Sequence, residues 1–271
     1  MVDIFHWQSD TPIIGDGVIT GCDENQEWML KWWWEHYIKC NSHPVTFLDF
    51  GMSKSALNWC KTKGAVISAS EPLPFIAAKE NIPKLKWKMW ERVYPGNIWN
   101  IRKACFAKTF AFLKTPYLRT LWIDLDAKVI QSISPLFDFV ENLNGFALAK
   151  AHLGYSQSSK IVGLYQKEDI VYNVGVLCYK YHSPVINSWT KNIYTRNQEF
   201  FAEEDLLARV LYEEKFIIKE LPSIYNYPFF HEKRVETVIL HYMGSLGKQE
   251  IVKELPLDYR SILTKGKGAG L

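Results

Sequence analysis

Two aspartates, Asp124 and Asp126, follow directly on an apolar run of the kind that forms a buried strand. In an extended chain, residues two apart point to the same face, so the two carboxylates would lie side by side. Like charges this close repel each other unless a cation compensates them. The pair therefore predicts a divalent-metal site with oxygen ligands. The alternative is a pair of solvated carboxylates in a turn.

His241 occupies a similar position, because it ends a second apolar run, 235–240, and comes just before Gly244. An imidazole beside the two carboxylates would favour Mn²⁺ over Mg²⁺. We therefore predict Asp124, Asp126 and His241 as ligands of one divalent ion. The simpler interpretation is a strand-end histidine that hydrogen-bonds to a backbone carbonyl.

Two further groups of charged residues could take part in chemistry. The acidic run Glu203, Glu204 and Asp205 opens a predicted helix, where it either complements the helix dipole or supplies a general base. Lys248 follows the segment 244–247, which begins and ends with glycine. We predict that this segment is a loop that closes over a ligand and brings the lysine to a leaving anion. The alternative is a flexible turn.

Strands and helices alternate along the chain, which predicts an α/β fold with a mostly parallel central sheet flanked by helices. Ligands bind beyond the carboxyl ends of the strands in such sheets. The loop around Asp23, after the first strand, is therefore expected at the same edge as the aspartate pair. Expected strands cover 17–22, 44–48, 65–68, 117–123, 145–150, 172–179 and 235–240, and expected helices cover 26–39, 53–61, 100–114, 184–196 and 203–212.

The stretch 71–100 interrupts this alternation with four prolines and a basic, aromatic segment at 84–90. We predict an inserted loop whose aromatic side chains tuck under a solvated face. A flap that binds an acceptor or a membrane surface is the alternative. The glycine- and lysine-rich tail, about 264–271, is expected to be flexible.

Read in order, these features resemble the GT-A glycosyltransferases, and most of all glycosyltransferase family 8, over about residues 17–248. The opening strand and Asp23 look like the family's uridine-binding start. The other landmarks are Trp122-Ile123-Asp124-Leu125-Asp126 for its Asp-x-Asp, Asn173-Val174-Gly175 for its Asn-Ser-Gly strand, Glu203-Glu204 where it carries Asp-Gln, and His241-Tyr242-Met243-Gly244 for its His-Phe-x-Gly ending.

The resemblance implies the GT-A fold, a Rossmann-like fold of nucleotide-diphospho-sugar transferases. It also implies an enzyme that moves a sugar from a nucleotide-diphosphate sugar, usually a UDP-sugar, to an acceptor with Mn²⁺ or Mg²⁺ and with retention of configuration. The site residues that it implies are Thr20, Gly21, Cys22 and Asp23 at the uracil end, Lys103, Lys108 or Arg102 as a cation before the aspartate pair, Asp124 at the ribose or the ion, Asn173, Gly175 and Gly244 near the donor, and Glu203, Glu204 and Lys248 in catalysis.

Two departures from the family pattern bear on mechanism. Glu203-Glu204 replaces Asp-Gln, which lengthens one carboxylate and turns an amide into a charge. A carboxylate of Glu203, Glu204 or Asp205 could then act as the base of an inverting reaction. Lys248 stands one residue later than the family's closing lysine.

Composition limits the alternatives. With 271 residues, 48% of them hydrophobic, the chain is expected to form one domain, 1–271, with a nucleotide-binding half at about 15–130 and an acceptor-binding half at about 131–255. A net charge of +3 argues against a nucleic-acid partner. Five unpaired cysteines, no signal sequence and no long apolar run predict a cytoplasmic protein, with peripheral membrane contact as an option.

Two other functions remain open. A nucleotidyltransferase would carry a glycine-rich phosphate loop after the first strand, and the segment 21–25 does not supply one. A non-catalytic module that binds nucleotide sugars or carbohydrates is the second, because fold alone does not fix function. For an enzyme, the acceptor could be a saccharide, a lipid-linked sugar or a protein.

Overall fold

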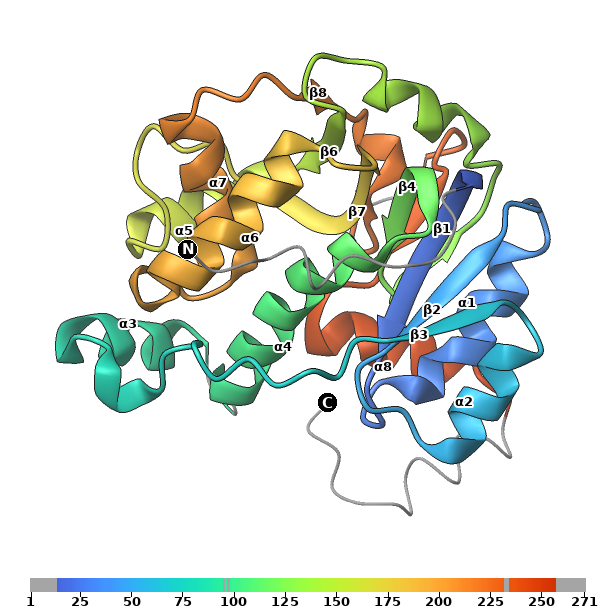
Figure 1. Ribbon diagram of the computed structural model, residues 1–271, viewed down its shortest axis with the longest axis horizontal. Helices are drawn as coiled ribbons and strands as arrows, with labels where there is room; N and C mark the ends of the chain where they lie inside the picture. The colour runs from blue at the N-terminus through green and yellow to red at the C-terminus, as the bar shows by residue number, and fades with distance from the viewer. Residues whose placement is uncertain (1–13, 95, 97, 232–233, 257–271) are drawn as a thin grey trace.

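A seven-stranded sheet forms the centre of the molecule, in the order β3-β2-β1-β4-β7-β6-β8 (Figure 1). The computed structural model describes residues 14–94, 96, 98–231 and 234–256. A second, small sheet joins three short strands in the order β5-β10-β9. The strands are β1 (Ile14–Cys22), β2 (Val45–Asp49), β3 (Ala65–Ser68), β4 (Tyr117–Ile123), β5 (Ala127–Val129), β6 (Phe146–Lys150), β7 (Tyr172–Lys180), β8 (Lys219–Glu220), β9 (Tyr227–Pro228) and β10 (Ile239–His241).

The sheet is mostly parallel, because β3, β2, β1 and β4 all run the same way. Strand β7 is antiparallel to both β4 and β6. The helices are α1 (Leu30–Tyr37), α2 (Lys54–Lys61), α3 (Lys84–Val93), α4 (Ile98–Ala111), α5 (Leu153–Ile161), α6 (Pro184–Arg196), α7 (Glu203–Glu213) and α8 (Gly244–Glu254).

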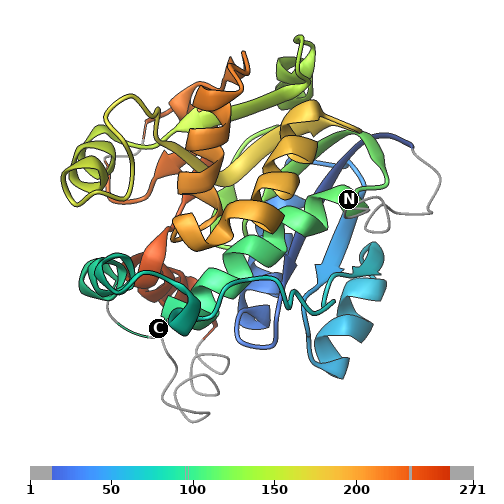
Figure 2. The ribbon, with the colours of Figure 1, turned by 60° about the vertical axis from the view of Figure 1, so that its left-hand side comes forward.

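Neighbouring residues on a strand contribute to opposite faces of the sheet. Leu121 packs into one hydrophobic cluster and Trp122 into the other, as the two-residue repeat of a strand requires. Helix α1 and the small sheet cover the first face. Helices α4, α6 and α7 cover the second and lie together in Figure 2. Both faces are therefore buried, which explains why the later residues of the central strands β1 and β4 are mostly apolar.

The predicted fold class is confirmed, and the expected first four strands appear as β1 to β4 with shifts of up to three residues. The helix predicted at 53–61 begins after Ser53, whose hydroxyl accepts a hydrogen bond from the Ala56 N–H at 3.2 Å. The helix predicted at 26–39 is shorter and consists of a 3₁₀ turn, Glu27–Met29, followed by α1. The predicted strand 235–240 shortens to β10.

The stretch 71–100 is not a loop throughout, as predicted, because it contains α3 and the start of α4. The expected tucking of its aromatic side chains is confirmed, since Trp90 is buried while Lys84 and Lys88 are exposed. Helix α3 follows Pro83, a residue that fits the edge of a first helical turn, where no intrahelical N–H is needed. A side cluster of Ile82, Trp90, Ile98 and Phe201 holds these helices to the body. The sequence pattern hid this cluster because its partner lies a hundred residues away.

The prediction of a flexible loop at 244–247 was also wrong, because these residues form the first turn of α8. Gly244 has a φ of 76°, a left-handed value that favours glycine where the chain enters the helix. A β-carbon on Gly247 would lie 2.0 Å from the Tyr242 carbonyl oxygen. Gly244 therefore serves the local backbone geometry and Gly247 allows close packing.

No helix in the described part of the chain is long and apolar enough to cross a bilayer. The tail that was predicted to be flexible, 264–271, lies outside the described residues.

Candidate functional site

The two aspartates lie on a turn between β4 and β5, not on an extended strand as expected. The Asp124 N–H donates to the Gly175 carbonyl at 2.8 Å, and the Ala127 N–H donates to the Asp124 carbonyl at 3.0 Å. These bonds fix the turn to the start of β7. The expected convergence with His241 is nevertheless present, since Asp124, Asp126 and His241 each offer a ligand atom and all three atoms lie within 4.8 Å of one another.

The small sheet brings His241 to the aspartates. His241 ends β10 opposite Ala127 of β5, and the Tyr242 N–H donates to the Asp126 carbonyl at 2.8 Å. The His241 Nε2 atom then lies 3.2 Å from Asp126 Oδ1. A β-carbon on Gly175 would lie 2.1 Å from the His241 ring. Glycine at this position therefore makes room for the imidazole.

Each aspartate carboxylate contacts a lysine. Lys108 Nζ, on α4, lies 2.8 Å from Asp124 Oδ1, which also accepts a hydrogen bond from the Trp122 indole at 2.6 Å. Lys248 Nζ, on α8, lies 3.2 Å from Asp126 Oδ2. The side chains thus arrange two positive charges around the carboxylate pair.

Of the three cations considered before the aspartate pair, only Lys108 contacts it. Arg102 is buried, and its guanidinium donates to the backbone carbonyls of Ala77 and Asn197, which makes it a structural residue. Lys103 is exposed on the same helix.

The surroundings keep these groups charged. Burial alone would raise the pKa of Asp126, but the positive charge of Lys248 holds the pKa of this carboxyl well below its usual range. Burial would likewise lower the pKa of Lys108, yet the nearby carboxylates of Asp124, Glu203 and Glu204 raise it. Asp126 is therefore an anion at neutral pH, as a metal ligand must be.

The three acidic side chains at the start of α7 make different contacts. Asp205 accepts hydrogen bonds from the backbone N–H groups of Phe201 and Ala202, both at 2.8 Å, so it caps the helix. Glu203 is buried, and its Oε2 has no hydrogen-bond partner among the described residues. Glu204 points to β7, where its Oε1 accepts from the Val174 N–H at 2.9 Å. All three residues lie in the first turn of α7, as the helix-start interpretation requires, and Asp205 alone of the three accepts the two capping hydrogen bonds.

We predict a pH dependence of stability that involves Glu204, measured in metal-free protein with a chelator present. Burial, together with the charge of Glu203, raises the pKa of Glu204 from 4.5 to about 8. Its contribution to stability is therefore fully present below about pH 4.5 and is lost as the pH rises through about 8.

Denaturant unfolding at several pH values checks this expectation. Glu204→Gln should lose less stability than the wild type between pH 6 and pH 9, because an amide does not ionise. Glu214→Gln, just beyond the end of the same helix, is the control and should follow the wild type. Equal pH slopes for Glu204→Gln and wild type would contradict the assignment.

Comparisons with known proteins identify the architecture. No family model and no curated protein matches this sequence. The galactosyltransferase LgtC, solved with donor and acceptor sugar analogues, matches with a TM-score of 0.54 and 15% identity over 91% of this chain and 99% of its own. Mouse xyloside xylosyltransferase 1 matches with a TM-score of 0.53 and 11% identity over 83% and 97%. This chain has the GT-A fold.

The bifunctional glycosyltransferase WbbM matches with a TM-score of 0.56 and 13% identity. The match covers 94% of this chain and 52% of WbbM, so the chain spans about half the length of that protein. At these identities the likeness establishes the fold, and membership of family 8 stays a prediction.

The residues predicted at the uracil end lie at the expected edge of the GT-A sheet, because β1 pairs with β4 from Ile14 to Ile19 and ends beside the aspartate turn. Asp23 accepts hydrogen bonds from the N–H groups of Asn25 and Gln26, at 2.9 and 3.2 Å, and so orders its own loop. Gly21 allows close packing, since a β-carbon there would lie 2.3 Å from the Leu48 carbonyl oxygen. The side chains of Thr20 and Cys22 are buried, so a ligand at this edge could contact the backbone of the loop and the side chain of Asp23.

Sequence reasoning missed Asn226, which the GT-A core buries between Asn173 and His241. It lies between the aromatic residues Tyr225 and Tyr227 in a stretch with no regular pattern. No local signal marks it, because its importance comes from contacts across the fold.

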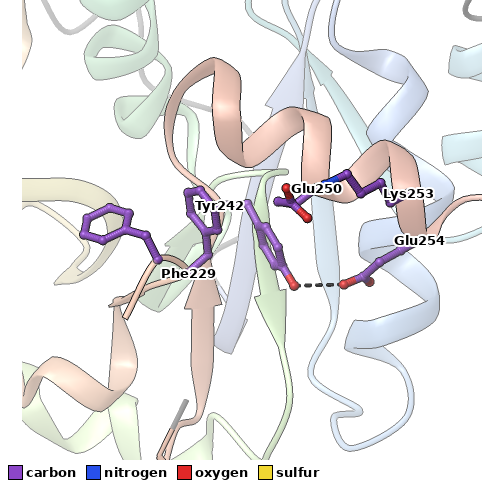
Figure 3. A pocket seen from close by; sticks show the side chains of 6 residues that line it. Phe229, Tyr242, Glu250, Lys253 and Glu254 are labelled. Carbon is purple, nitrogen blue, oxygen red and sulfur yellow. Dashed lines mark hydrogen bonds and ion pairs between the residues drawn. The ribbon is translucent and has the colours of Figure 1, made fainter. Parts of the chain in front are cut away.

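A pocket of about 440 Å³ lies between Tyr242 and helix α8 (Figure 3). Tyr242, the residue after His241, lines this pocket, and its hydroxyl donates to Glu254 at 2.8 Å. The lining residues are Phe229, Phe230, Tyr242, Glu250, Lys253 and Glu254. None of the three candidate metal ligands lines it, so this pocket is separate from the metal centre.

Proposed function

We propose that this protein is a metal-dependent glycosyltransferase that moves a sugar from a UDP-sugar to a saccharide, lipid-linked or protein acceptor. The observation that carries the proposal is the convergence of Asp124, Asp126 and His241 at the carboxyl edge of β4 in a GT-A fold. The similarity to LgtC, a galactosyltransferase solved with donor and acceptor sugar analogues, supports sugar transfer as the reaction class.

The residues fit a divalent ion. Ligand atoms that share an ion at about 2 to 2.3 Å stand at most ~4.6 Å apart, close to the spacing of the three atoms here. Two carboxylates and an imidazole suit Mn²⁺ better than Mg²⁺, which prefers oxygen alone. Such an ion, when bound, would neutralise negative charge on the diphosphate of the donor.

The protein's own groups would stabilise the diphosphate further. Lys248 lies beside Asp126, and α8 begins at Gly244, three residues after His241. The first N–H groups of a helix have no intrahelical partner and favour anions. We infer that a fixed helix start and Lys248, in place of a closing loop, hold the leaving diphosphate.

The environment of the acidic run favours retention over inversion. An inverting reaction needs a carboxylate base that is ionised. Asp205 is bound to two backbone N–H groups, and burial together with the charge of Glu203 raises the pKa of Glu204 to about 8, which disfavours the ionised form of Glu204 at neutral pH. Glu203 is buried and its pKa is likewise raised by burial.

Calorimetry with UDP, in the presence and absence of Mn²⁺, tests the proposal. We expect binding with Mn²⁺ and at least tenfold weaker binding with a chelator. A panel of nucleotide sugars, followed by mass spectrometry of acceptor mixtures, would then identify the donor. Sugar binding with the same affinity in the presence and absence of Mn²⁺ would favour a non-catalytic module. Formation of UDP-sugar from UTP and a sugar phosphate would favour a nucleotidyltransferase.

A further inference from the structure

A chain of side-chain hydrogen bonds leads away from the metal centre. The His241 Nδ1 atom lies 2.8 Å from Asn226 Oδ1. The Asn226 amide nitrogen donates to Asn173 Oδ1 at 2.8 Å and to the Asn173 carbonyl at 3.2 Å. The Asn173 amide nitrogen in turn lies 3.3 Å from Glu204 Oε1. Three side-chain contacts thus connect His241 with Glu204.

A backbone group fixes which atom donates and which accepts in each of these side-chain hydrogen bonds. The Gly175 N–H donates to Asn173 Oδ1 at 3.1 Å, so that atom is an oxygen and the amide nitrogen faces Glu204. Asn226 must then present its own nitrogen to Asn173 and its oxygen to His241. Because an amide oxygen can only accept, the His241 Nδ1 atom must carry a proton.

This arrangement decides how His241 meets the ion. A neutral imidazole carries one proton, so with Nδ1 protonated the Nε2 lone pair faces Asp126 and is free to bind a metal. The opposite tautomer would place a proton on Nε2, 3.2 Å from Asp126 Oδ1. A hydrogen bond between these two atoms would leave neither Nε2 nor Asp126 Oδ1 available to bind the ion.

Burial leaves water little opportunity to replace these partners. Asn226 is 5% exposed and His241 is 3% exposed. A buried partner that keeps Nδ1 protonated fixes the tautomer and the orientation of the ring. It also raises the basicity of Nε2, which makes the histidine a stronger metal ligand.

We propose that Asn226 is a positioning residue that holds His241 in its metal-binding tautomer. The inference rests on the proposed function, since it concerns the same ion. It differs from a purely structural role for Asn226, which would require only the two hydrogen bonds to Asn173.

Two variants separate these roles. Asn226→Ala removes the acceptor for His241 and both donors to Asn173. Asn226→Asp keeps an acceptor for His241 but loses the donors. Both variants should lower the melting temperature, whereas only Asn226→Ala should weaken Mn²⁺ binding, by about 10- to 100-fold.

A matched control is Asn142→Ala, since Asn142 donates to the carbonyls of Phe139 and Phe146 before β6, at the opposite edge of the sheet. It should lower stability and leave the Mn²⁺ affinity unchanged.

Two measurements read the result. Titration with Mn²⁺, with and without UDP and followed by electron paramagnetic resonance, gives the affinity. Nitrogen-15 NMR of the metal-free protein, well above the usual histidine pKa of about 6.5, shows which ring nitrogen of His241 carries the proton. We expect Nδ1 in the wild type and in Asn226→Asp, and Nε2 in Asn226→Ala.

Wild-type affinity for Mn²⁺ in Asn226→Ala, or equal losses in both variants, would overturn the inference and leave the proposed function intact. A protonated Nε2 with a bare Nδ1 in the wild type would also overturn it. A wild type that binds no Mn²⁺ in the presence of UDP would overturn the proposed function, and this inference with it.

Discussion

Replacing Asp126 with asparagine is expected to abolish Mn²⁺-dependent binding of UDP and to lower the transfer rate roughly a thousandfold or more. Asp126 carries the one carboxylate in the site that contacts both His241 and Lys248. An amide keeps the shape but removes the negative charge, so the lysine and the imidazole are left around a neutral group. Calorimetry and a transfer assay would measure the two losses.

The control is Asp138→Asn, because Asp138 is an exposed aspartate that pairs with Arg119 on the surface. Exposed pairs of this kind contribute little, so the control should keep full activity. The metal-free Asp126→Asn protein should melt at a lower temperature than the wild type, since a carboxyl with a strongly lowered pKa contributes to stability at neutral pH. Full transfer activity in Asp126→Asn would exclude Asp126 as a metal ligand.

Replacing Lys248 with alanine is expected to lower turnover by roughly ten- to a thousandfold, the scale of one charged stabiliser in a site that excludes water. The affinity for the acceptor should change little, because the lysine lies beside the metal ligands. Lys253→Ala is a matched control on the same helix, since Lys253 is paired with Glu250 at the surface. Single-turnover kinetics with saturating donor would measure the effect.

Unaltered turnover in Lys248→Ala would transfer the role to Lys108. Among the cations considered, Lys108 is the next to touch the aspartate pair, through Asp124. Arg102 is committed to backbone carbonyls and Lys103 points to solvent, so neither can take its place without rearrangement.

The parts of the fold that the sequence could predict are those with strong local periodicity. The apolar run before Asp124 and the capped helix after Ser53 are visible in the sequence, because burial on both faces and a capping hydroxyl leave local signatures. Since ligands of a parallel sheet bind at the carboxyl ends of its strands, the position of Asp124 and Asp126 after β4 could be predicted as well. His241 lies on the small sheet, so its approach to the aspartates does not follow from this rule.

The parts that could not be predicted depend on contacts between distant segments. Strands β9 and β10 have two and three residues, too few to show alternation. Choosing Lys108 over Lys103 required knowing which side of α4 faces the sheet, and this helix has apolar residues on most of its circumference. For Gly175, the glycine favoured a strand bulge or a close donor sugar. Strand β7 does shift register against β6 between Asn173 and Leu177, as a bulge does, and the His241 ring occupies the space beside Gly175, which the sequence did not indicate.

The small sheet that carries His241 has a consequence for the biogenesis of the protein. Asp126 and Lys248 are 122 positions apart in the sequence, and His241 lies between them in the sequence, seven residues before Lys248. On the ribosome, strands β1 to β4 can pair while the later segments are still being synthesised, yet the site proposed for the ion and the donor is incomplete until β10 and α8 have emerged. Under the proposed function, a donor would therefore bind only the fully synthesised and folded chain. By mass action, this binding would raise the stability of the complete fold over that of the partly synthesised chain.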